Sequence, residues 1–205
     1  MLIVLMATAC TTGAGLEVLR APDETLRVER TAQTLVRAFP ANISRRSFTF
    51  QIVGDDRASA WNIAPGIVYL SHTVARDAPD DELAQLIAHS LGHDLLAHPV
   101  ADVNPSGARQ AMEEVAIAVV PGGLLLAGIV EGVRESSEYT LAQEIEAERI
   151  GLRLWLHSGR SCAMWISLRL AQRARGDSWH EPIKNVPPPY EDLLSTVKQE
   201  CVGRQ

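Results

Sequence analysis

The sequence has 205 residues, of which 46% are hydrophobic and 21% are charged, which is enough for one globular domain with its own core. Its formal net charge is -6, and no run of Lys or Arg occurs in it. Because binding to nucleic acid needs a concentrated basic surface, this composition argues against a nucleic-acid partner.

The N-terminus resembles the end of a bacterial lipoprotein signal. An apolar run precedes Cys10, and small polar residues follow it. Residues 1–15 are therefore predicted to be a signal or lipid-anchor remnant with a linker, and Cys10 is predicted to carry lipid. No basic segment precedes the run, and Ala7 stands where such signals usually have Leu, so a short buried segment with an inert cysteine is the alternative. If Cys10 is lipidated, only Cys162 and Cys201 remain to form a disulfide.

Residues 16–205 are predicted to form a single α+β domain that is mainly helical. Apolar residues at helical spacing predict an amphipathic helix from Leu16 to Phe39, which Pro40 ends. Alternating apolar and polar residues then predict a strand at 47–53, and a turn separates it from further strands at 58–62 and 66–71. We expect these strands to form a small antiparallel sheet.

More helices are predicted in the second half of the chain. Acidic residues start a helix at Pro79 that is expected to run to about His98, before Pro99. The apolar stretch from Val115 to Val130 is too short and too interrupted for a membrane span, so it is expected to form buried helical pieces or a hairpin, with an interfacial contact as the alternative. Later helices are expected at 139–157, 162–175 and 190–200.

The helix from Pro79 to His98 contains a pair of histidines. His89 and His93 are four residues apart, so they share one face of the helix and their imidazoles can converge on one metal ion. The same spacing occurs in the zinc-protease motif H-E-x-x-H, whose glutamate is the general base. Ser90 occupies that glutamate position here.

A later helix contains two carboxylates with the same spacing. Glu144 can donate an oxygen ligand to zinc, and Glu148, one turn further on, can accept a hydrogen bond from a ligand imidazole and so orient it. Taken alone, such a pair is more often part of a solvated acidic face.

From Asn62 to His98, and again at Glu144, the sequence resembles the HtpX/BepA-like zinc metallopeptidases, gluzincins that also include the CAAX prenyl proteases. The matching segments are Pro65-Gly66-x-Val68-Tyr69-Leu70, Asp80-Asp81-Glu82-Leu83-Ala84, Ala88-His89-x-x-Gly92-His93 and Glu144-x-x-Ala147-Glu148. The resemblance covers Leu16 to Leu170 and implies a zincin-like fold. It also implies that His89, His93 and Glu144 bind zinc and that Glu148 orients a ligand.

The chain departs from this family at the residues that carry the chemistry. The family's glutamate activates the attacking water and passes the proton to the leaving amine, whereas Ser90 has no accessible pKa for that task. Members also often have Thr-His-Pro and a following Arg near the C-terminus, where this chain has Val186-Pro187-Pro188 and no Arg before Arg204.

Other nearby side chains offer little compensation for the missing base. Asp94 lies four residues after Ser90, and its carboxylate is a candidate substitute base, although its reach is short. Glu146 points away from the face shared by Glu144 and Glu148. His98 is expected to cap the C-terminus of its helix.

These patterns predict a zinc-binding metalloendopeptidase-family protein of the bacterial cell envelope, with proteolysis impaired or lost at Ser90. The resemblance implies a membrane-anchored periplasmic lipoprotein whose partner is a polypeptide substrate or an envelope protein. The alternatives are a pseudoprotease that binds polypeptides without cutting them, and a structural lipoprotein in which no metal binds.

Overall fold

The structure is a computed structural model that describes residues 18–37, 48–54, 60–64, 66–98, 139–175 and 190–202. The predicted lipid-anchor segment with Cys10 and the apolar stretch from Val115 to Val130 lie outside these residues. Within the described ranges, none of the helices has both the length and the apolar character that a membrane crossing needs.

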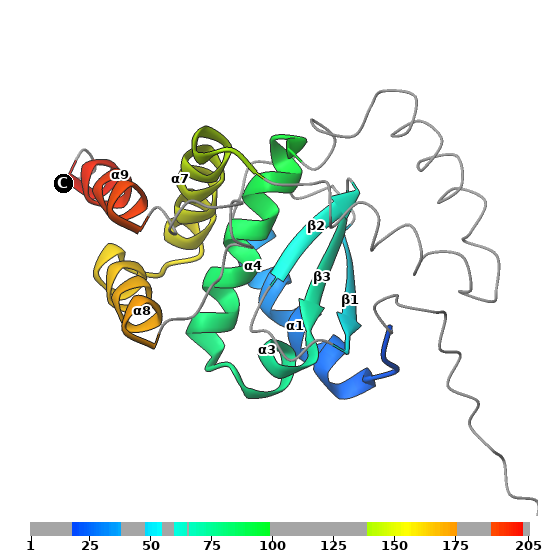
Figure 1. The fold of residues 1–205 in the computed structure, drawn as a ribbon. Coiled ribbons are helices and arrows are strands. Elements are labelled where there is room, and N and C mark those ends of the chain that lie inside the picture. Colours follow the sequence, from blue (N-terminus) through cyan, green and yellow to red (C-terminus); the bar gives the residue numbers. More distant parts are fainter. Residues whose placement is uncertain are drawn as a thin grey trace, which may run out of the picture.

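The described chain is mainly helical and has one small sheet, as the sequence predicted (Figure 1). The helices are α1 (Pro22–Val36), α3 (His72–Asp77), α4 (Asp80–Leu95), α7 (Leu141–His157), α8 (Cys162–Arg175) and α9 (Tyr190–Val202). The strands are β1 (Thr49–Val53), β2 (Ala60–Ala64) and β3 (Ile67–Ser71). Among these elements only α3 was not anticipated.

The sheet is mixed, so the prediction of an antiparallel sheet was wrong for one of its two strand pairs. Its order is β1-β3-β2; β2 pairs antiparallel with β3, whereas β1 pairs parallel with β3. Ala64 at the end of β2 pairs with Ile67 at the start of β3, and Gly66 has a φ of 80°, so this pair is a tight hairpin. A longer connection separates β1 from β2. The alternation of side chains along a strand does not show whether its neighbour runs parallel or antiparallel, so the sequence pattern could not predict the direction of β1.

The first helix begins later than predicted, at Pro22 instead of Leu16. Proline is favoured in the first turn because its φ is already helical and its missing N–H would have no partner there. The preceding residues are extended: Val18 forms a bridge with Val53, and the Leu19 N–H donates to the Ile52 carbonyl at 2.8 Å. They therefore cover the outer edge of β1.

Helix α4 ends at Leu95, three residues before the predicted end at His98. Ala97 has a φ of 57°, a left-handed conformation that stops the helix. The chain turns at Ala97, so His98 does not lie where helical spacing predicted it.

Helix α4 lies between the sheet and the C-terminal helices α7, α8 and α9 (Figure 1). All its residues from Glu82 to Asp94 are buried, including polar ones. Leu83, Ile87 and Leu91 pack into the core with strand residues and with Trp155 of α7. A helix buried on every side belongs to the core of a domain, and each of its polar side chains needs a partner inside the protein.

Two glycines allow α4 and α7 to pack with their backbones close together. A Cβ atom added at Gly92 would lie 2.3 Å from the Ala147 carbonyl oxygen, and one added at Gly151 would lie 2.9 Å from the Ala88 carbonyl oxygen. Because the later residue of α4 faces the earlier residue of α7, the two helices run antiparallel. Their separation is set by backbone contact.

A Gly92→Ala substitution tests this close packing. Alanine is the better helix former by about 1 kcal/mol, so the substitution would stabilise a helix with free space at this position. We expect instead a loss of about 1–3 kcal/mol in the free energy of unfolding, because the methyl group forces the helices apart. Urea unfolding measures the change, and an unfolding free energy equal to or above that of the native protein would contradict the contact.

A disulfide joins Cys162, at the start of α8, to Cys201, near the end of α9. These are the two cysteines that remain once Cys10 is set aside. The bond closes a loop with a sequence separation of 39 residues. A cross-link of this length restricts the unfolded chain and stabilises the fold by about 4 kcal/mol in the loop-entropy model.

Replacing both bonded cysteines with Ser measures this stabilisation. We expect the Cys162→Ser/Cys201→Ser variant to lose about 2–4 kcal/mol of unfolding free energy in urea. The matched control is Cys10→Ser, which should leave the unfolding free energy unchanged. It should also leave unchanged the mass of the disulfide-linked peptides that contain Cys162 and Cys201. If peptide mass analysis under non-reducing conditions finds Cys162 and Cys201 as free thiols, the bond is refuted.

Candidate metal centre

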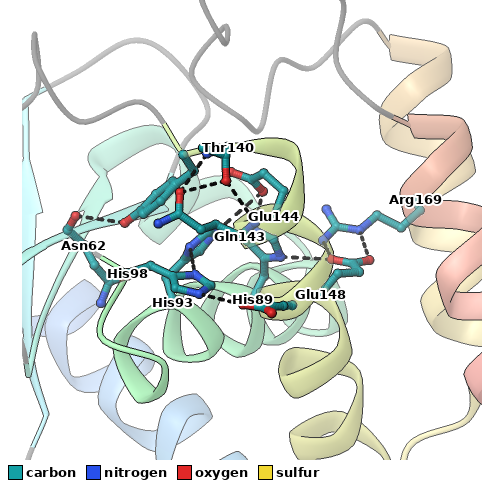
Figure 2. Close-up of polar contacts among 11 residues, drawn as sticks. Asn62, His89, His93, His98, Thr140, Gln143, Glu144, Glu148 and Arg169 are labelled. Atoms are coloured by element: carbon teal, nitrogen blue, oxygen red, sulfur yellow. Dashed lines mark hydrogen bonds and ion pairs between the residues drawn. The ribbon is translucent and has the colours of Figure 1, made fainter. Parts of the chain in front are cut away.

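Three buried side chains from α4 and α7 bring potential metal ligands together (Figure 2). The Nε2 atom of His89 lies 3.1 Å from Oε2 of Glu144 and 3.1 Å from Nε2 of His93. The Nε2 atom of His93 lies 3.7 Å from the same Glu144 oxygen. This group could hold a metal ion, and it consists of the three residues that the sequence predicted as ligands.

The distances among the three donor atoms fit a four-coordinate ion. Ligand atoms about 2.0 Å from a tetrahedral centre lie about 3.3 Å from one another. The observed separations of 3.1, 3.1 and 3.7 Å are close to this value. Three donors at this spacing form one face of a tetrahedron and leave the fourth position to a further ligand.

Local structure explains why these donors converge. His89 and His93 are one turn apart on α4, and Glu144 lies in the first turn of α7. Thr140 and Gln143 form a capping box that determines where α7 begins. With the start of α7 defined and its axis held close to α4, the Glu144 carboxylate reaches both histidines.

Glu148 lies directly behind His89, as predicted, and is completely buried. Its Oε2 accepts a hydrogen bond from His89 Nδ1 at 2.9 Å, and its Oε1 accepts from Trp165 Nε1 at 2.7 Å and from Arg169 Nε at 2.9 Å. Arg169 Nη2 donates to Oε2 as well. Since Nδ1 of His89 is occupied by this bond, its Nε2 is the atom that faces Glu144 and His93.

The charges in this centre shift the pKa values of its groups. Burial alone would raise the pKa of Glu148, but the Arg169 charge and the His89 hydrogen bond outweigh it and hold the pKa well below the usual range. Burial would likewise lower the pKa of His89, but the carboxylates of Glu144 and Glu148 raise it. His93 has less compensation, and burial lowers its pKa to about 4.

His98 contacts the centre, so its predicted role as a helix cap was wrong. Its Nδ1 lies 3.1 Å from Nδ1 of His93, and its Nε2 lies 3.2 Å from Oε2 of Glu146. The turn at Ala97 brings it there, which helical spacing could not show. Burial lowers the pKa of His98.

Tyr139 is a second residue of the centre that the sequence did not indicate. Its ring stacks on the His93 ring, with centroids 3.7 Å apart and planes inclined by 23°. Its hydroxyl donates to the Asn62 backbone carbonyl at 3.2 Å. Tyr139 therefore links the candidate metal-binding group to strand β2.

Ser90 and the two carboxylates considered as substitute bases, Asp94 and Glu146, have different surroundings. Ser90 is 1% exposed, and its hydroxyl oxygen has no hydrogen-bond partner within the described part of the chain. Asp94 accepts a hydrogen bond from the Gly66 backbone N–H and so holds the β2–β3 turn against α4. Glu146 faces His98. The structure thus gives Asp94 and Glu146 other contacts.

Comparison with known proteins adds no relative: no protein-family model matches the sequence, and a search of curated proteins finds no significant match.

Replacing a ligand histidine tests whether this group binds metal. We expect His93→Ala to weaken zinc binding by at least about 100-fold, because a three-residue site loses one of its ligands. Metal analysis after dialysis and competition with a chromogenic chelator measure the change. His157→Ala is the matched control, since His157 is an exposed histidine at the end of α7. Equal zinc affinity in the two variants would exclude His93 as a ligand.

Proposed function

We propose that this protein is a degenerate member of the HtpX/BepA-like zinc metallopeptidases. It binds zinc through His89, His93 and Glu144, and it binds polypeptides with impaired or lost proteolysis. The observation that carries this proposal is the convergence of two imidazoles and one carboxylate at tetrahedral spacing. Two histidines and one glutamate are the protein ligands of several catalytic zinc sites, in which a fourth position stays open.

The buried partner of His89 supports a metal over a purely structural cluster. Glu148 fixes the tautomer that leaves Nε2 available, which is the usual arrangement behind a zinc-binding histidine. The Glu144 carboxylate, which lies beside the Nε2 atoms of both His89 and His93, also favours a cation among these three groups. A divalent ion would provide that charge.

Ser90 determines what chemistry the centre retains. Bound zinc would act as a Lewis acid on a peptide carbonyl and on the attacking water. A hydroxyl at Ser90 can donate or accept a hydrogen bond, but it cannot hold and return a proton near neutral pH. The neighbouring carboxylates have other contacts: Asp94 accepts from Gly66, and Glu146 lies against His98.

The position of β2 supports a polypeptide as the ligand. In the described sheet this strand lies at the edge, next to α4. Tyr139, whose ring stacks on His93, donates a hydrogen bond to its backbone. The side-chain amide of Asn62 is buried, and neither its oxygen nor its nitrogen has a partner in the described ranges. An extended peptide can pair with an exposed strand edge through main-chain hydrogen bonds.

The cell envelope is the proposed location. A disulfide between Cys162 and Cys201 persists in oxidising compartments such as the bacterial periplasm and is rare in the cytosol. The lipoprotein-like start with Cys10 is a separate observation that favours the same location and a lipid anchor in the membrane.

The alternative is a fully non-catalytic pseudoprotease or a structural lipoprotein that binds envelope partners. The buried Ser90 hydroxyl, which finds no partner among the described residues, favours loss of catalysis over an unrecognised base. Zinc content separates the two alternatives, because the structural lipoprotein would hold no metal and would gain no thermal stability from added zinc.

Restoring the glutamate tests the assignment of the catalytic position. We expect Ser90→Glu to raise the rate of casein or peptide cleavage by about 10²–10⁴-fold over the native protein, because it supplies a general base. Ser90→Gln is the matched control, since it has nearly the same shape as glutamate but cannot accept the proton. Both variants should hold as much zinc as the native protein.

Two results would count against the proposal. Cleavage by the native protein at the rate of Ser90→Glu would mean that another base operates. A zinc-loaded and folded Ser90→Glu variant that cleaves no faster than Ser90→Gln would remove the support for a peptidase scaffold.

A further inference from the structure

His98 has no role in the proposed function, although it is 8% exposed and lies against a proposed metal ligand. We propose that His98, which is itself hydrogen-bonded to Glu146, is a positioning residue for His93. The two ligand histidines are then oriented by different kinds of side chain, His89 by a carboxylate and His93 by an imidazole. The inference rests on the proposed metal site and assigns a role to residues outside the ligand set.

The hydrogen-bond chain has one arrangement of protons that is compatible with metal binding. When Nε2 of His93 binds an ion, the ring proton is on Nδ1, which must then donate. The acceptor at 3.1 Å is Nδ1 of His98. The proton of neutral His98 is therefore on Nε2, and it is donated to the Glu146 carboxylate at 3.2 Å.

Two contacts hold the His93 ring in complementary ways. Stacking against Tyr139 fixes the plane of the ring. The bond to His98 selects one of the two orientations related by a 180° flip of the ring, because it holds Nδ1 in one direction (Figure 2). Together they direct Nε2 toward His89 and Glu144, from which it is 3.1 and 3.7 Å away.

The partners of the two ligands differ in charge and in burial. His89 is held by a fully buried carboxylate that is itself paired with Arg169. His93 is held by an imidazole whose own partner, the Glu146 side chain, is 57% exposed. These hydrogen bonds run from His93 in the buried centre through His98 to Glu146 at the protein surface. The turn of the backbone at Ala97 places His98 between the other two residues.

The test compares two replacements of His98 in the full-length protein. In His98→Asn, the amide oxygen lies near the position of Nδ1 and can still accept from His93, whereas His98→Leu offers no acceptor. We expect His98→Leu to weaken zinc affinity by about 10–100-fold in chelator competition and His98→Asn to restore most of it. Glu146→Gln, which acts one bond further out, should cost only a few-fold.

Cobalt substitution provides a readout that a merely structural role would not change. We expect the visible absorption of the Co²⁺-loaded His98→Leu protein to differ from that of the native protein, because the His93 ring rotates, and His98→Asn to restore the native spectrum. Thermal unfolding of the metal-free variants checks the fold. If His98→Leu unfolds, His98→Gln replaces it, since its amide is displaced by one methylene group.

The outcomes separate this inference from the proposed function. Native zinc affinity and a native cobalt spectrum in His98→Leu, or in both His98→Gln and His98→Asn, would overturn the positioning role and leave the metal site intact. If the native protein itself binds neither Zn²⁺ nor Co²⁺, the proposed metal site fails, and the role of His98 fails with it.

Discussion

The rest of the structure depends on the direct contact between the backbones of α4 and α7. Gly92 faces the Ala147 carbonyl, and Gly151 faces the Ala88 carbonyl, with no room for a side chain at either position. This contact sets the distance between the helix that holds the histidines and the helix that holds the glutamates. At a larger separation, the short reach of Glu144 would not place its oxygen 3.1 and 3.7 Å from the two imidazoles on the facing helix.

The burial of α4 from Glu82 to Asp94 makes the surrounding helices part of the centre even where they supply none of its three candidate ligands. Trp165 and Arg169 of α8 both donate to Glu148, which in turn holds His89. Cys162, Trp165 and Arg169 follow the spacing of one helix face, so the disulfide anchors the same face of α8 that binds Glu148. The packing of α8, the compensation of the Glu148 charge and the orientation of His89 therefore depend on one connected set of contacts.

Local patterns in the sequence predicted much of this arrangement. Helix-ending residues located the C-terminal ends of α7 and α8, and the four-residue spacings identified His89, His93, Glu144 and Glu148. Three features lay beyond such patterns. The parallel pairing of β1 depends on contacts between distant segments, the position of His98 depends on one left-handed residue, and the Arg169–Glu148 pair joins helices that no spacing rule relates.

The disulfide also gives the domain a covalent ring, because the peptide chain from Cys162 to Cys201 is closed by the bond between them. A single proteolytic cut anywhere between α8 and α9 would open the backbone without releasing α9. The two fragments would separate only after reduction. The ring would therefore keep α9 joined to α8, the helix whose Trp165 and Arg169 donate to Glu148, even in a nicked molecule.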